Sequence, residues 1–263
     1  MNLLRLAITV PLILGLATAI GGCSDDDGGV SGSGNIITRD FDLGGFTNVR
    51  LHLFHAEITQ SDSYGVSVRV DDNVIDQIDV ETSGDTLVLR LSSGTRFSGN
   101  VTLEATITMP TIESLELNGA ASANIGGFDS LDTIELDLNG ASDVNGVLTA
   151  DRIQIDASGA SKVTGEFAAD GVEIDARGAS RVTLEGSATN VTLDASGASN
   201  IDLADFVAAT GEVELSGASE ATVNITESID RVDVIGASKL RYKGDPTLGD
   251  VSTAGASSVD RVD

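Results

Sequence analysis

The sequence predicts an all-β protein, a parallel β-helix with coils of 19–20 residues. The first observation is a tripeptide, Gly-Ala-Ser, that recurs through the second half of the chain with its serines 19 or 20 residues apart. A fixed repeat of this length is typical of a solenoid, in which each coil buries its apolar face by stacking on the next. The second observation is an alternation of apolar and polar residues between the tripeptides, which indicates strands.

Each tripeptide is expected to form a corner of its coil. Glycine tolerates the positive φ of a sharp bend, and alanine and serine are small enough to stack on their own copies. No histidine recurs beside the serines, so we interpret them as packing residues rather than nucleophiles. The first copy is slightly longer, Gly-Ala-Ala-Ser. The corner glycines are Gly119, Gly140, Gly159, Gly178, Gly197, Gly217, Gly236 and Gly255.

Between two corners the pattern predicts two or three short strands. In residues 134–138, Ile-Glu-Leu-Asp-Leu, the apolar side chains fall on one face and the acidic ones on the other. A second short strand follows each corner, as in residues 162–164, Lys-Val-Thr. Successive coils should lie about 4.8 Å apart, the spacing of paired strands. Large apolar residues recur at one position of the repeat, six or seven residues after the corner serine, and predict an interior column. Its members are Phe128, Leu148, Phe167, Phe206 and Ile225, and Gly186 occupies this position in the one coil that lacks a large residue.

Residues 35–112 also alternate like strands but lack the tripeptide. Turn signals such as Ser-Gly-Asp at 83–85 separate their segments. We interpret 35–112 as wider, irregular coils that cap the solenoid, because terminal repeats are usually atypical. Residues 113–263 would be the regular coils, and 35–263 one continuous domain.

The first 22 residues have the pattern of a targeting segment. Arg5 precedes an apolar stretch that ends in Ile-Gly-Gly-Cys, which resembles a bacterial lipoprotein signal cut before a lipidated Cys23. An ordinary signal peptide and an uncleaved anchor are the alternatives. Residues 23–34 would be the lipidated cysteine and a flexible linker of Gly, Ser and Asp. Ser24 after the cysteine favours the outer membrane, with the protein facing the periplasm or the cell surface. Cys23 is the only cysteine, so an intramolecular disulfide is excluded.

The chain is strongly acidic, with a formal net charge of −26. Such a charge argues against nucleic acid or an anionic lipid surface as a partner, because both would be repelled. The expected contact with a membrane is therefore through the lipid anchor.

Several segments together resemble the bacterial head GIN domain family, described as adhesin heads of autotransporters. They are Phe-Thr-Asn-Val at 46–49, Gly-Asp-Thr-Leu-Val-Leu at 84–89, and 107–120, which runs from Ile-Thr-Met-Pro to Leu-Asn-Gly-Ala. The resemblance covers nearly all of residues 36–260. It implies a right-handed β-helix in an exported protein or lipoprotein, and it offers no catalytic residues.

One set of residues could carry chemistry, an acidic ladder three positions before every corner glycine except the last, where Ser252 takes this place. By the alternation above, this station faces solvent. Two unit charges about 4.8 Å apart repel by about 0.9 kcal/mol even in water, so the ladder needs cations, raised pKa values or nearby basic residues. We weigh a site for Ca²⁺, which favours several oxygen ligands, against a role in solubility. The ladder comprises Glu116, Asp137, Asp156, Asp175, Asp194, Glu214 and Asp233.

Enzyme function is poorly supported. The only histidines, His52 and His55, are three apart and should point to opposite faces of a strand. We therefore predict a non-enzymatic exported lipoprotein that serves adhesion, binding or envelope structure, with an unknown protein or glycan ligand. The alternative is a carbohydrate-active β-helix, although Trp is absent and aromatic residues are 3% of the chain. Homo-oligomerisation through the solenoid ends is a further hypothesis.

Overall fold

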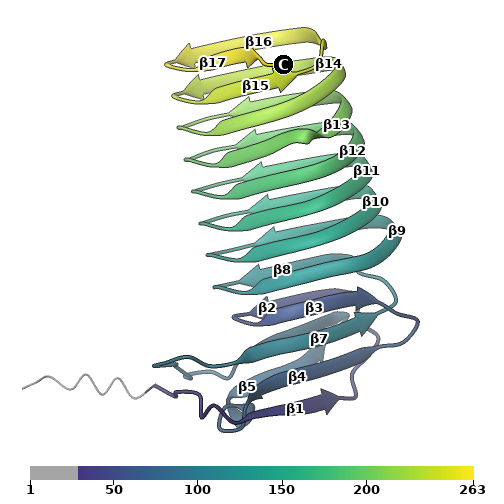
Figure 1. Cartoon of the computed structure of the whole chain (residues 1–263), viewed down its shortest axis with the longest axis vertical. Helices are drawn as coiled ribbons and strands as arrows, with labels where there is room; N and C mark the ends of the chain where they lie inside the picture. Colours follow the sequence, from purple (N-terminus) through teal and green to yellow (C-terminus); the bar gives the residue numbers. More distant parts are fainter. Residues whose placement is uncertain (1–28) are drawn as a thin grey trace, which may run out of the picture.

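The computed structural model of the chain describes residues 29–263 and shows a tall stack of β-coils (Figure 1). No α-helix occurs in this range, only a short 3₁₀ turn, η1 (Ile75–Gln77). The predicted all-β parallel solenoid is confirmed. The signal segment 1–22, Cys23 and the start of the expected linker lie outside the described residues. Within 29–263 there is no helix of the length and apolarity needed to cross a membrane.

Six long strands form the regular part of the stack, and each pairs in parallel with the next. Each strand bends midway, so that its first half contributes to one side of the coil and its second half to the other (Figure 1). We call these sides face 1 and face 2. The six strands are β9 (Ser122–Leu138), β10 (Asp143–Ala157), β11 (Lys162–Ala176), β12 (Arg181–Ala195), β13 (Asn200–Leu215) and β14 (Glu220–Gly236).

Three shorter strands continue the stack above β14. They are β15 (Lys239–Lys243), β16 (Thr247–Gly255) and β17 (Ser258–Arg261). β15 pairs with the first half of β14 on face 1, β16 with its second half on face 2, and β17 with β15.

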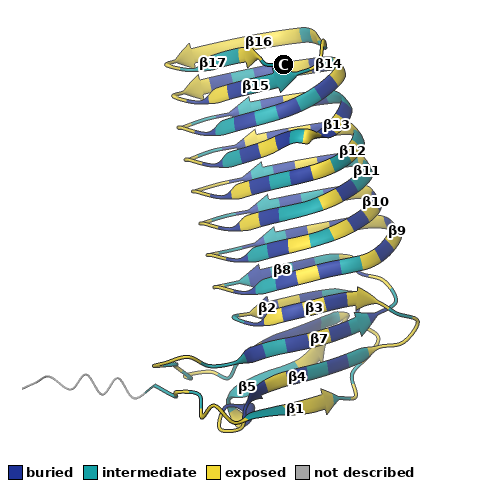
Figure 2. Cartoon of the chain, viewed as in Figure 1, coloured by how far each residue is buried: buried dark blue, intermediate teal, exposed yellow. Residues whose placement is uncertain are grey.

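The predicted interior column is in register for most of its length. Phe128 pairs with Leu148, Leu148 with Phe167, Phe167 with Gly186, and Gly186 with Phe206. The four large side chains are buried, and buried residues recur along the coils from β9 to β14 (Figure 2). Close packing of large apolar side chains is the main source of stability for such a stack.

The column departs from the prediction at its last member. Ile225 is buried, but it lies opposite Ala208 rather than Phe206. The register of β13 against β14 shifts between Asp202 and Val207 and twice more before Glu212, and the coil that contains β13 is one residue longer than the next.

The Gly-Ala-Ser corners repeat one hydrogen-bonded geometry. Gly159 has φ +79°, and a Cβ there would lie 2.4 Å from the carbonyl oxygen of Gly140 in the coil below. The same oxygen accepts a hydrogen bond of 2.7 Å from the amide of Ala160. The Ser161 hydroxyl is buried and donates to the carbonyl of Ser158 at 2.8 Å. All eight corner glycines have a positive φ.

The N-terminal part does not stack in chain order. The coil made by β2 and β3 lies between the coil of β6 and β7 and the coil of β8 and β9, since β2 pairs with β6 and β8, and β3 with β7 and β9. These strands are β2 (Asn48–His52), β3 (His55–Gln60), β6 (Thr86–Leu91), β7 (Leu103–Met109) and β8 (Ser114–Asn118).

The end of the solenoid contains antiparallel strands as well as parallel ones. β1 (Ile36–Phe41) pairs antiparallel with β4 (Gly65–Asp71), which pairs antiparallel with β7. β5 (Ile78–Ser83) and β6 form a hairpin across Gly84 and Asp85, with φ +65° at the glycine. A two-residue turn can join only antiparallel neighbouring strands. The Gly-Asp turn at 84 and 85 therefore reverses the direction of the chain at the cap.

A buried carboxylate ties the start of the chain to this cap. Asp71 is 2% exposed and accepts backbone hydrogen bonds from Gly34 at 2.7 Å and Thr102 at 2.8 Å. These donors, that of Thr102 above all, hold the pKa of the Asp71 carboxyl below its usual value. Val30 forms a bridge with Phe97. Val30 and Gly34, at the end of the expected linker, thus contact the cap.

Candidate functional site

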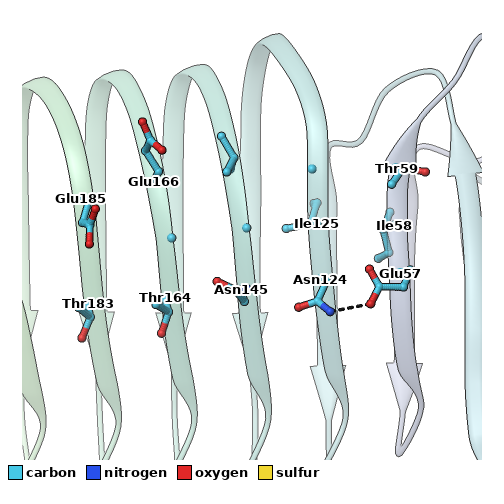
Figure 3. A pocket seen from close by; sticks show the side chains of 14 residues that line it. Glu57, Ile58, Thr59, Asn124, Ile125, Asn145, Thr164, Glu166, Thr183 and Glu185 are labelled. Carbon is cyan, nitrogen blue, oxygen red and sulfur yellow. Dashed lines mark hydrogen bonds between the residues drawn. The ribbon is translucent and has the colours of Figure 1, made fainter.

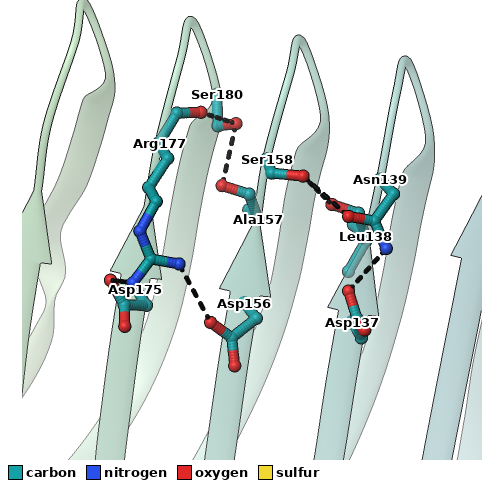
Figure 4. Close-up of polar contacts among 9 residues, drawn as sticks. All are labelled: Asp137, Leu138, Asn139, Asp156, Ala157, Ser158, Asp175, Arg177 and Ser180. Carbon is teal, nitrogen blue, oxygen red and sulfur yellow. Dashed lines mark hydrogen bonds and ion pairs between the residues drawn. The ribbon is translucent and has the colours of Figure 1, made fainter.

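The acidic ladder lies on face 2 with its members in direct register. Asp156 pairs with Asp137 on one side and with Asp175 on the other, and the pairing runs from Glu116 to Asp233. Figure 4 shows Asp137, Asp156 and Asp175 of the ladder on neighbouring strands. Most ladder side chains are only half-exposed, because neighbouring rungs shield each carboxylate.

Partial burial makes ionisation of the ladder costly. The pKa values of Asp137, Asp156 and Asp194 are raised, first by burial and then by the charges of neighbouring carboxylates. For Asp194 the charged neighbours are Asp175 and Glu214. The ladder therefore stores electrostatic repulsion at neutral pH.

Arginines at other positions of the repeat neutralise part of this negative charge. The acidic positions considered alone did not predict these arginine partners. Arg50 pairs with Glu116 at the cap end of the ladder. Arg177 lies between two rungs, 2.8 Å from Asp175 and 3.6 Å from Asp156 (Figure 4).

Further along, Arg231 lies 2.6 Å from Glu214. Asp137 instead accepts a hydrogen bond of 2.8 Å from the side-chain amide of Asn139. Asp194 forms no ion pair within the described part of the chain, and one oxygen of Asp233 is buried without a hydrogen-bond partner there. Asp194 and Asp233, whose charges are not neutralised by an ion pair in the described range, are thus not adjacent in the ladder.

The ladder does not form a chelating cluster. Residues 29–263 contain no group of three or more His, Cys, Asp or Glu side chains arranged to hold a metal ion. Each rung contributes one carboxylate, whereas Ca²⁺ takes six to eight oxygen ligands. Calcium binding by the ladder stays a prediction.

The two histidines lie on opposite sides of the coil. His55, on β3, shares a hydrogen bond of 2.5 Å with Ser122 on the neighbouring strand of face 1. His52, on β2, lines a hollow on face 2 together with Arg50 and Arg90. The structure does not bring them together as a metal pair or as part of a catalytic triad.

A groove on face 1 was not predicted from the sequence. It is open to solvent, has a volume of about 470 Å³ and crosses β3, β9, β10, β11 and β12 (Figure 3). Two rows of outward side chains form its walls. One row is Glu57, Asn124, Asn145, Thr164 and Thr183, and the other is Thr59, Val147, Glu166 and Glu185.

Glycines shape the floor of the groove. Gly146 and Gly165 face each other on neighbouring strands, between Ile125 below and Leu184 above. A Cβ on Gly146 would lie 2.4 Å from the carbonyl oxygen of Ile125, and one on Gly165 would lie 2.4 Å from that of Gly146. The strands thus approach too closely there for any side chain, and the surface is hollowed. The sequence signal was a glycine four residues after each of two successive corner serines.

The groove is lined by both apolar and polar side chains, and no Lys or Arg of residues 29–263 is among them. Its walls contain the carboxylates Glu57, Glu166 and Glu185, and Glu166 faces Glu185 on the next rung. The side-chain amide of Asn124 donates to Glu57 at 2.6 Å. The hydroxyl of Thr164 is inaccessible to solvent and has no hydrogen-bond partner in the described range.

The sequence profile described as "Putative auto-transporter adhesin, head GIN domain" matches residues 45–246. The chain belongs to the head GIN domain family. The resemblance noted from the sequence is thereby confirmed. No curated protein matches the chain.

Solved structures show the same fold as this head GIN domain. A "putative lipid binding protein" from Parabacteroides distasonis is 19% identical with a TM-score of 0.78, and a "putative adhesin" from the same species is 18% identical with a TM-score of 0.79. A "putative adhesin" from Parabacteroides merdae is 17% identical with a TM-score of 0.77. Each likeness covers 89% of this chain and 99% of the other.

Proposed function

We propose that this head GIN domain is a non-enzymatic binding head of the adhesin type, held at the bacterial cell envelope by a lipid on Cys23. The observation that carries the proposal is the long in-register stack, which presents regular polar faces over a continuous buried core. Such a rigid, elongated surface suits many weak contacts with a partner better than it suits a single enclosed reaction site. The family description supports the same role.

The site chemistry favours binding over catalysis. Across residues 29–263 the histidines lie on opposite faces, and six of the corner serines are buried, with Ser142, Ser161 and Ser199 donating to backbone carbonyls. A nucleophile needs a base within hydrogen-bond reach, and among the corner serines of this range only Ser122 has a histidine there, His55 at 2.5 Å. The ladder carboxylates repeat from rung to rung, whereas acid–base catalysis needs two carboxyl groups in distinct environments.

The test uses the full chain in an expressing bacterium. We expect labelled palmitate to be incorporated into the wild-type protein and to be lost in Cys23→Ala. We expect cells that carry the wild-type protein to attach to host or bacterial surfaces more strongly than cells that carry the unanchored variant. Proteinase treatment of intact cells would locate the head on the outer or inner side of the membrane. Equal attachment of both strains would refute the proposal.

A second candidate is a polysaccharide-cleaving enzyme, and the groove with its three carboxylates is the observation that favours it. Incubation with polysaccharides and measurement of new reducing or unsaturated ends separates the two functions. Turnover would establish the enzyme, and binding without turnover would support the adhesin.

A further inference from the structure

We propose that the groove on face 1 binds a linear, hydroxyl-rich glycan, neutral or bearing amino groups, that lies along the solenoid axis with about one sugar per rung. This inference rests on the proposed binding function and names its site and ligand class. Nothing in the family description assigns a ligand to this surface.

The direction of the groove is the first reason. It runs across five successive rungs, from β3 to β12, a length of about 19 Å at the spacing of paired strands. An extended polymer can therefore lie in it over several repeats. The strands beneath are already paired on both sides, so a peptide cannot join them by β-strand addition, which needs a free edge.

The repeat distance is the second reason. Wall side chains recur once per rung, at about 4.8 Å, whereas an extended peptide presents side chains on one face only about every 6.6 Å. A peptide laid across the rungs would fall out of step within two residues. A pyranose ring in an extended glycan spans nearly one rung, so its hydroxyls can meet successive wall residues.

The chemistry of the wall is the third reason. Asn145 and Thr183 present an amide and a hydroxyl group in one in-register row, on either side of Thr164, whose hydroxyl is inaccessible to solvent. Vicinal sugar hydroxyls donate and accept, and so they can bond to the amide and the hydroxyl.

The opposite wall of the groove discriminates between ligands by their charge. Glu166 and Glu185 face each other across neighbouring rungs, and neither forms an ion pair within residues 29–263. They would repel uronic acids and attract amino groups. Val147 is 56% exposed beside them and offers an apolar contact for the C–H face of a sugar ring, in place of an aromatic side chain.

The experiment is calorimetric titration of the head with three hexasaccharides. They are cellohexaose, a chitosan hexamer and hexagalacturonate, which are neutral, amino-bearing and anionic. We expect binding of the first two, with the chitosan hexamer tighter, and no binding of the third. The double variant Asn145→Ala/Thr183→Val should lose about tenfold in affinity or more, the effect of one or two hydrogen bonds. Glu166→Gln should abolish the preference for amino groups while cellohexaose still binds.

A matched control lies in the same row of face 1 outside the groove. Thr222→Val, on β14, should bind as the wild type does. Thermal melts of every variant confirm that the fold is kept, and Glu166→Gln provides an independent readout if the double variant unfolds. Equal losses in the control and the double variant would overturn the proposal, as would tighter binding of a lysine-rich peptide than of either glycan. Attachment of cells without any glycan binding would refute the groove assignment and leave the adhesin function standing.

Discussion

Replacing Asp194 with asparagine should stabilise the protein. Asp194 is a ladder member whose two neighbours, Asp175 and Glu214, are both acidic and which, like Asp137, has no arginine partner of its own in the described part of the chain. Burial and these neighbours raise its pKa. The substitution keeps the shape of the side chain and removes the charge.

The magnitude follows from the rung spacing. Two neighbours at about 4.8 Å each repel a unit charge by about 0.9 kcal/mol in water, or about 1.7 kcal/mol together. Screening at physiological ionic strength, where the Debye length is about 8 Å, reduces this to about 1 kcal/mol. For a domain of this size that corresponds to a rise in melting temperature of about 2–4 °C.

The assay is thermal or urea unfolding of both proteins over a range of salt concentration. The gain in the free energy of unfolding should be largest, about 1.5 kcal/mol, in about 0.01 M salt, where the Debye length is about 30 Å. It should fall to a few tenths of a kcal/mol in about 1 M salt. The matched control is Glu212→Gln on the same strand, because Glu212 faces Thr192 and the oppositely charged Arg231. That change should leave stability unaltered or slightly lower.

The pH dependence gives a second readout with a definite sign. A carboxyl whose folded pKa is raised binds protons more tightly in the native state, so the wild type gains stability as pH falls from the raised value towards 3.8, the ordinary value for Asp. The advantage of Asp194→Asn should shrink across this window. A variant that is destabilised, or a gain that is independent of salt and pH, would refute the account of the ladder as stored repulsion.

Four further outcomes are expected. Arg177→Gln should lower stability by about 1 kcal/mol in urea unfolding, since it leaves two half-buried carboxylates facing each other, whereas Arg181→Gln in the same coil should not. Gly159→Ala should cost more than 1–2 kcal/mol, because φ is +79° and the coil below blocks a Cβ, whereas Gly126→Ala, with open space and no such φ, should be nearly neutral. Asp71→Asn should increase amide hydrogen exchange at the start of the chain, and in the wild type the stability from this lowered pKa should be present above pH 3.8 and lost as pH falls further. Calcium at millimolar concentration should raise the melting temperature more than sodium chloride of equal ionic strength, and an equal rise would show that the ladder is only screened.

The regular coils could be predicted because their information is local and repeated. Three features of each repeat determine its structure once the coils stack in register. The glycine forms the corner, the alternating residues form the strands between corners, and the large apolar residue at one position of the repeat fills the interior. The same logic placed the ladder from Glu116 to Asp233 in one column. The slip at Ile225 escaped prediction because a bulge can absorb an extra residue at several places in a coil.

The groove escaped prediction for a different reason. Gly146 and Gly165 look like ordinary small residues in the sequence, and only the close approach of the strands turns them into a hollow floor. The sequence also did not predict that Arg177 neutralises part of the ladder's charge. Arg177 occupies a different position of the repeat from the ladder carboxylates, and only its long side chain brings its charge close to Asp156 and Asp175.

The sequence by itself determined the coil length, the corners, the columns of like residues and the strong negative charge. These follow from the short-range rules of backbone conformation and from a repeat that stacks each residue on its own copy. The tertiary structure alone decided the order of the first coils, where β2 and β3 insert between strands that come later in the chain. It also decided which carboxylates meet arginines and where the surface is hollow, because these depend on distances between residues that the sequence places far apart.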